Sequence, residues 1–97
     1  MNSSHFTGTA SHVEAGETAD GAHRFINFVL TDDSARQPVT VRVTAYDELA
    51  DDFGDQIVNG RRIAVSGRLR SKSSSGTAPP IACWIVADSM GMGPVRA

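Results

Sequence analysis

The amino-acid sequence predicts a single small all-β domain. Its 97 residues, 40% of them hydrophobic, suffice for one core and leave no room for a second. Apolar residues recur at every second position in several segments, which is the spacing of strands that bury one face. One segment, residues 47–60, has the spacing of a helix instead. The sequence therefore predicts a sheet protein with one helix.

Alternation of apolar and polar residues marks five strands. They are expected at Ser4–Ala15, Arg24–Thr31, Pro38–Tyr46, Asn59–Lys72 and Ile81–Ser89. The third, "PVTVRVTAY", is the clearest, with Val39, Val41, Val43 and Ala45 expected in the core and Thr40, Arg42, Thr44 and Tyr46 outward. A polar hairpin loop, "EAGETADG", joins the first two strands, and "SSSGTAPP" joins the last two.

The helix is expected within "YDELADDFGDQIVNG". Leu49, Phe53 and Ile57 are four residues apart and form an apolar stripe. Asp47 is the expected N-cap and Gly60 the expected C-terminal stop.

Three strands, one helix and two further strands follow the order of the OB-fold, a five-stranded Greek-key barrel with the helix between strands three and four. We expect this domain to span residues 1–92, with a short C-terminal tail at 93–97. Gly67 interrupts the fourth strand, which indicates a bulge or a barrel corner.

The single cysteine and the hydropathy pattern bear on location. Cys83 lies in the apolar run Ile81–Ala87, so we expect a buried thiol and a reducing compartment. That run is far shorter than the roughly 20 residues that span a bilayer, and the N-terminus lacks a secretory signal pattern. We therefore expect a cytoplasmic protein with no membrane partner.

Positive charge is concentrated locally in a chain whose net charge is -2. Arg62, Arg68, Arg70 and Lys72 stand at alternate positions of the fourth strand without a carboxylate among them, and Arg42 projects outward from the third. Such a surface can bind a phosphodiester backbone, although an ordinary solvated sheet face has the same pattern.

Motifs for catalysis, metals and cofactors are lacking. His5, His12 and His23 have no metal-ligand spacing and are expected on the surface of the first hairpin. The carboxylates between Asp47 and Asp55 spread around a helix and do not converge. We therefore expect neither an enzyme, nor a metal site, nor a cofactor.

The block from Asn27 to Met92 resembles the bacterial single-stranded DNA-binding (SSB) protein family. "NFVLTDDS" resembles its second strand and the loop after it, "IVADSM" resembles its last strand, and "VRVTAYDELADDFGDQIVNGRRIAVSGRLRSK" resembles its aromatic-ended strand, "LA" helix and "GRLR" strand. The resemblance implies an OB-fold that binds single-stranded DNA by phosphate contacts and base stacking, and that assembles as a homodimer or homotetramer. The acidic C-terminal tail of that family does not occur in this sequence, so we expect a short form.

The resemblance also assigns roles to individual residues. It places Tyr46 at a base-stacking position and Arg42, Arg70 and Lys72 at cations that contact the backbone. Tryptophans that the family usually carries are replaced by Arg36, Thr40 and Ser74. Arg36 can stack by its guanidinium plane and Trp84 is expected outward on the last strand, so both can compensate. The candidate nucleic-acid-binding residues are Arg36, Arg42, Tyr46, Arg62, Arg68, Arg70, Lys72 and Trp84.

Two alternatives stay open at this point. Missing tryptophans and an acidic net charge also fit an OB-fold protein-interaction or scaffold subunit with weak or no nucleic-acid binding. RNA is an alternative ligand, because stacking and phosphate contacts do not by themselves distinguish the two sugars.

Phe25 is expected opposite the core face, either as a further stacking ring or as part of a subunit interface.

Overall fold

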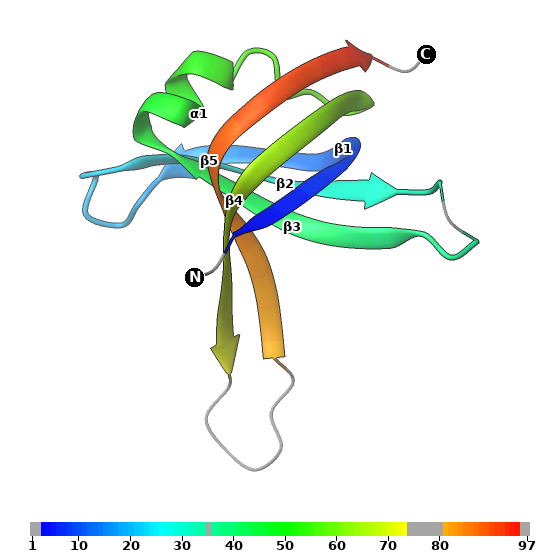
Figure 1. The fold of residues 1–97 in the computed structure, drawn as a ribbon. Helices are drawn as coiled ribbons and strands as arrows, with labels where there is room; N and C mark the ends of the chain where they lie inside the picture. Colours follow the sequence, from blue (N-terminus) through cyan, green and yellow to red (C-terminus); the bar gives the residue numbers. More distant parts are fainter. Residues whose placement is uncertain (1–2, 35, 74–80, 96–97) are drawn as a thin grey trace.

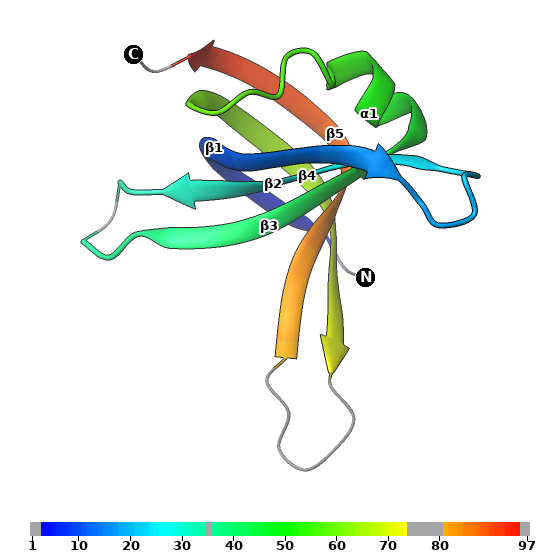
Figure 2. The same ribbon diagram turned by 180° about the vertical axis from the view of Figure 1, so that it is seen from behind.

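The computed structural model describes residues 3–34, 36–73 and 81–95, which form five strands and one helix. The elements are β1 (Ser4–Glu17), β2 (Arg24–Asp32), β3 (Val39–Tyr46), α1 (Asp47–Phe53), β4 (Arg61–Ser73) and β5 (Ile81–Val95). The strands close into a barrel in the order β1-β2-β3-β5-β4, shown in Figures 1 and 2. β3 and β5 pair in parallel, and the other neighbouring strands pair antiparallel. The prediction of an OB-fold is confirmed.

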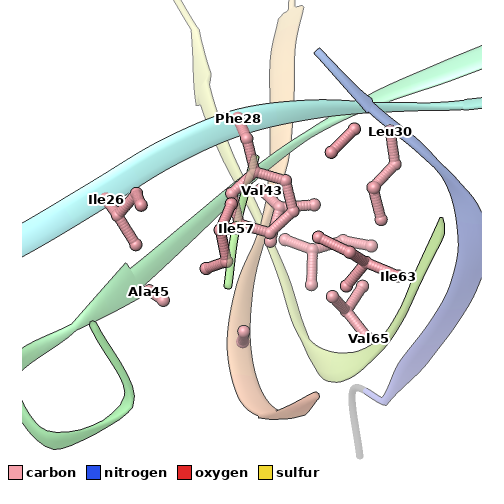
Figure 3. Packing of buried hydrophobic residues seen from close by; sticks show 11 residues of the cluster. Ile26, Phe28, Leu30, Val43, Ala45, Ile57, Ile63 and Val65 are labelled. Atoms are coloured by element: carbon pink, nitrogen blue, oxygen red, sulfur yellow. The ribbon is translucent and has the colours of Figure 1, made fainter. Parts of the chain in front are cut away.

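The barrel interior is filled by the alternating apolar residues (Figure 3). The buried cluster consists of Ala10, Ile26, Phe28, Leu30, Val43, Ala45, Ile57, Ile63, Val65, Ile85 and Ala87. Full burial of one large aliphatic or aromatic side chain contributes about 1.5–3 kcal/mol. Since all five strands and the segment after α1 supply members, this one cluster holds the barrel closed.

Three residues differ from the simple alternation. Val39 is 52% exposed, although it was expected in the core, and Leu69 is 41% exposed at an apolar position of β4. Thr44, expected outward in solvent, is only 7% exposed because Asn27 of the paired strand β2 covers it and accepts its hydroxyl hydrogen bond.

α1 is shorter than its apolar stripe predicts. It begins at Asp47, with Tyr46 as the N-cap, and its C-cap is Gly54, not Gly60. The expected stripe still contacts the core, because Leu49 and Phe53 pack against it and Ile57 is 2% exposed just beyond the helix. Glycine at position 54 weakens helix propagation there, so the chain turns and delivers Ile57 to the barrel.

β4 and β5 extend beyond the barrel as a two-stranded arm (Figures 1 and 2). β3 pairs with β5 only from Trp84 to Val86, so no third strand among the described residues pairs with the arm beyond that point. The β4–β5 register shifts between Ser66 and Gly67, and a Cβ at Gly67 would lie 2.0 Å from a β5 carbonyl oxygen. The bulge or corner expected at this glycine is therefore confirmed.

Two further expectations, the end of the fifth strand and the burial of Cys83, differ from the structure. β5 continues to Val95, past the expected end at Ser89, so Gly93–Val95 of the expected 93–97 tail are strand residues paired with the start of β4. Cys83 was expected to be buried, and that prediction is wrong: it lies exposed on the arm, where two strands alone cannot enclose a side chain. In the described part of the chain, none of the helical structure has the length and apolar character that a membrane span requires.

Candidate nucleic-acid interface

One outer face of the sheet gathers most of the candidate side chains. The register makes Arg42 of β3, Trp84 of β5 and Arg70 of β4 direct neighbours. Arg68 belongs to the next row, opposite Val86. Paired residues of adjacent strands project on the same side of a sheet, so these arginines flank the indole on both sides. Arg42, Arg68 and Arg70 are exposed and Trp84 is half-buried.

Tyr46 ends β3 on the same side as Arg42 and is 43% exposed. The chain turns sharply behind it, since Asp47 has a positive φ of 48°. The Asp47 carboxylate accepts hydrogen bonds from the His23 ring at 2.9 Å and from the Arg24 backbone N–H at 3.3 Å. These contacts tie the end of β3 to the β1–β2 hairpin and so hold the Tyr46 backbone in place.

A hollow lies between these side chains. It is lined by Asn27, Arg42, Thr44, Tyr46 and Trp84 and has a volume of about 250 Å³; we call it the trough. A second hollow of about 310 Å³ adjoins it, since Asn27 and Arg42 also line that one together with His12 and Glu14 of β1. β1 carries a register shift between Ser11 and Glu14, and His12 has a φ of 54° there. The bulge turns this part of β1 toward the outer face.

Electrostatics distinguish the arginines of this face from Arg24. Within the described residues, the guanidinium groups of Arg42, Arg68 and Arg70 make no ion pair. Arg24, in contrast, donates two hydrogen bonds to the Asp51 carboxylate at the hairpin and helix end of the molecule. Those contacts raise the pKa of Arg24. The positive charge beside the trough is therefore available to an anionic ligand.

Three carboxylates away from the trough have lowered pKa values, whereas Glu14 of β1 lines the adjoining hollow. The Ser34 hydroxyl and backbone N–H donate to Asp32 and lower its pKa, and the nearby positive charge of Arg62 adds to that effect. The pKa of Asp47 is lowered chiefly by the hydrogen bond from His23. The pKa of Asp20 is lowered chiefly by the Thr18 hydroxyl. None of these three carboxylates lines the trough.

The remaining candidates lie apart from the trough. Arg62 is half-buried and pairs with Thr9 of β1, whereas Arg68 and Arg70 pair with β5. Arg36 is exposed in the loop between β2 and β3, beyond the opposite end of β3 from Tyr46. Lys72 lies in the arm, where its backbone pairs with Ala82. Ser74, where the family usually has a tryptophan, lies outside the described residues.

Sequence patterns did not single out Asn27 and Thr44. Asn27 is a poor strand former inside an apolar strand, and this conflict with β-propensity was the one signal available. Phe25, the next outward residue, is half-buried, and its ring lies 3.1 Å from where a Cβ on Gly16 would sit. Its ring therefore covers β1 and does not extend the trough.

The described residues contain no cluster of metal ligands. Among them, no group of three His, Cys, Asp or Glu side chains is placed to hold an ion. The three histidines are exposed, on β1 and at the end of the first hairpin.

The barrel and the outer face that carries the trough define an OB-fold domain with an open surface of arginines and aromatic rings. Among solved structures, it is similar to the crystal structure of the SSB domain of a Synechococcus sp. protein, with a TM-score of 0.75 and 18% sequence identity over 93% of each chain. At this identity the likeness shows the fold. Neither a family model nor a curated protein matches the chain.

Proposed function

We propose that this domain binds single-stranded DNA with little base specificity and performs no chemistry on it. The observation that carries the proposal is the trough, where two aromatic rings and an arginine without an ion pair among the described residues surround one open hollow. Arg68 and Arg70 continue the positive surface along β4. Rings stack on bases while cations hold the phosphates, which is how OB-folds bind single strands. The SSB domain of the structurally similar Synechococcus protein supports this assignment.

Binding energy in this proposal comes from two sources. Stacking of one base on an aromatic side chain contributes about 1–3 kcal/mol. Each phosphate neutralised on a single strand adds about 0.7 to the slope of log affinity against log salt. If Arg42, Arg68 and Arg70 each neutralise one phosphate, the slope is about -2 for one subunit. Such a module would protect single strands exposed in replication, recombination or repair.

Self-association is part of the proposal. From Ser4 to Gly8, β1 pairs only with β4, so its other edge carries backbone groups without a strand partner among the described residues. Unpaired strand edges favour addition of a further strand. We propose a homodimer or homotetramer assembled through β1, and sedimentation equilibrium tests it. Linked subunits would raise the affinity of one trough by effective concentration.

The test is a titration of fluorescently labelled oligo(dT) by anisotropy at several salt concentrations, with duplex DNA and oligo(rU) as comparison ligands. The proposal expects binding of oligo(dT) above duplex, a negative salt slope and a response of Trp84 emission. No binding at low salt and micromolar protein would instead favour the protein-interaction or scaffold subunit. Equal binding of oligo(rU) would extend the proposal to RNA.

A further inference from the structure

Asn27 and Thr44 form a polar pair at the floor of the trough. They are direct partners in the β2–β3 register, and the Thr44 hydroxyl donates to the Asn27 amide oxygen at 2.7 Å. Thr44 is 7% exposed, whereas Asn27 is half-buried and lines both hollows of the outer face. Thr44 is therefore covered by its neighbours, and Asn27 is the member of the pair that a ligand can reach.

The hydrogen bond fixes which end of the Asn27 amide is available. Because the amide oxygen accepts the Thr44 proton, the opposite end of the planar group, Nδ2, remains with two N–H donors. Within the described residues, Nδ2 makes no hydrogen bond. Arg42, also at the trough, has donors only, and no carboxylate lines the hollow. Donors therefore predominate among the groups that meet a base stacked here.

We propose that Asn27 is a specificity-determining residue of this surface, and that it favours bases with a carbonyl oxygen at position 4 of a pyrimidine or position 6 of a purine over bases with an amino group there. Thymine, uracil and guanine present a carbonyl oxygen where cytosine and adenine present N–H donors. Thr44 acts as a positioning residue, because its hydroxyl decides the orientation of the amide. This inference rests on the proposed single-strand binding and adds a modest bias to it.

The size of the bias follows from a single hydrogen bond. A net contribution of one neutral hydrogen bond corresponds to a change in affinity of about two- to tenfold. Such a ratio leaves the domain able to bind mixed sequences. A comparison of two bases of equal size separates this hydrogen-bond contribution from stacking, because the stacking contribution is then nearly the same for both.

The experiment compares oligo(dU) with oligo(dC) of the same length at pH 8, by competition against labelled oligo(dT). Both bases are pyrimidines, so ring area changes little between them. The wild-type protein is expected to bind oligo(dU) about two- to tenfold more tightly. Asn27→Asp replaces the donor by an acceptor, so it should weaken both ligands through its charge and abolish or reverse the ratio.

Thr44→Val keeps the side-chain shape and removes the hydroxyl. The Asn27 amide is then free to rotate, and the ratio should fall toward one. Thr40→Val is the matched control, because Thr40 is an exposed threonine on the same side of β3 that pairs with Thr31 and not with an asparagine. Circular dichroism of each variant verifies the fold, and Asn27→Asp tests the inference independently if Thr44→Val unfolds.

The outcomes separate this inference from the proposed function. If oligo(dU) and oligo(dC) bind equally, the base selectivity is wrong and single-strand binding stands. A ratio that neither Asn27→Asp nor Thr44→Val alters would also overturn the inference, since the bias would then arise from strand flexibility. If neither oligomer binds, the proposed function fails and the inference fails with it.

Discussion

Replacing Arg68 and Arg70 together by glutamine should weaken DNA binding in a salt-dependent way. Both are exposed, and neither forms an ion pair within the described residues, so the substitution removes charge without breaking a native contact. Loss of two phosphate contacts reduces the magnitude of the salt slope by about 1.4 for one subunit. Since counterion release contributes nothing at 1 M salt, the same exponent predicts about a 25-fold weaker affinity at 0.1 M salt. At 0.5 M salt the expected loss is about threefold.

The assay is anisotropy of labelled oligo(dT) between 0.05 and 0.5 M salt. The control is Arg24→Gln with Arg62→Gln, which changes net charge equally but acts away from the trough, where Arg24 pairs with Asp51 and Arg62 lies beside β1. This control should keep the wild-type slope within about 0.3, because remote charges contribute little beyond a Debye length. Equal effects of the two double variants would refute the local reasoning and leave only a net-charge effect.

Three further results are expected. Tyr46→Leu should weaken oligo(dT) binding by about 5- to 150-fold by removing one stacking ring, whereas Tyr46→Phe should stay near wild type; equal losses in both variants would exclude stacking. The Asp47 carboxyl, followed by NMR, should titrate below its usual pKa of 3.8 and return toward that value in His23→Ala. Because folding lowers the pKa of Asp47, the contribution of this carboxylate to stability is present above pH 3.8 and is lost as the pH falls through the folded-state pKa. An unshifted titration of Asp47 would contradict the His23 contact. Gly67→Ala should lower stability by about 1–3 kcal/mol, measured as a fall in thermal midpoint, and an unchanged midpoint would contradict the close approach of β5.

Alternation along strands was sufficient to predict which side chains share the outer face. Arg42 and Tyr46 project together because they are four residues apart on β3, and Trp84 was expected outward for the same reason. Local sequence contains this information, since the two-residue period fixes direction without reference to the rest of the fold. The order of elements predicted the barrel because few topologies connect strands in that order.

Contacts between strands could not be predicted in the same way. Burial of Thr44 depends on its pairing with Asn27, which comes from another strand. Arg62 has the same parity as Arg68, yet it pairs with Thr9 of β1. Exposure of Cys83 depends on the β4–β5 arm leaving the barrel, which a count of apolar residues does not reveal.

The most direct test of the DNA-binding face is an NMR titration of ¹⁵N-labelled protein with oligo(dT), followed amide by amide. The account predicts shift changes concentrated at the trough and along β4, at Asn27, Arg42, Tyr46, Arg70 and Trp84, with little change around His5 and Thr7 of β1. Changes centred on β1 or on α1, with the trough amides unmoved, would contradict it.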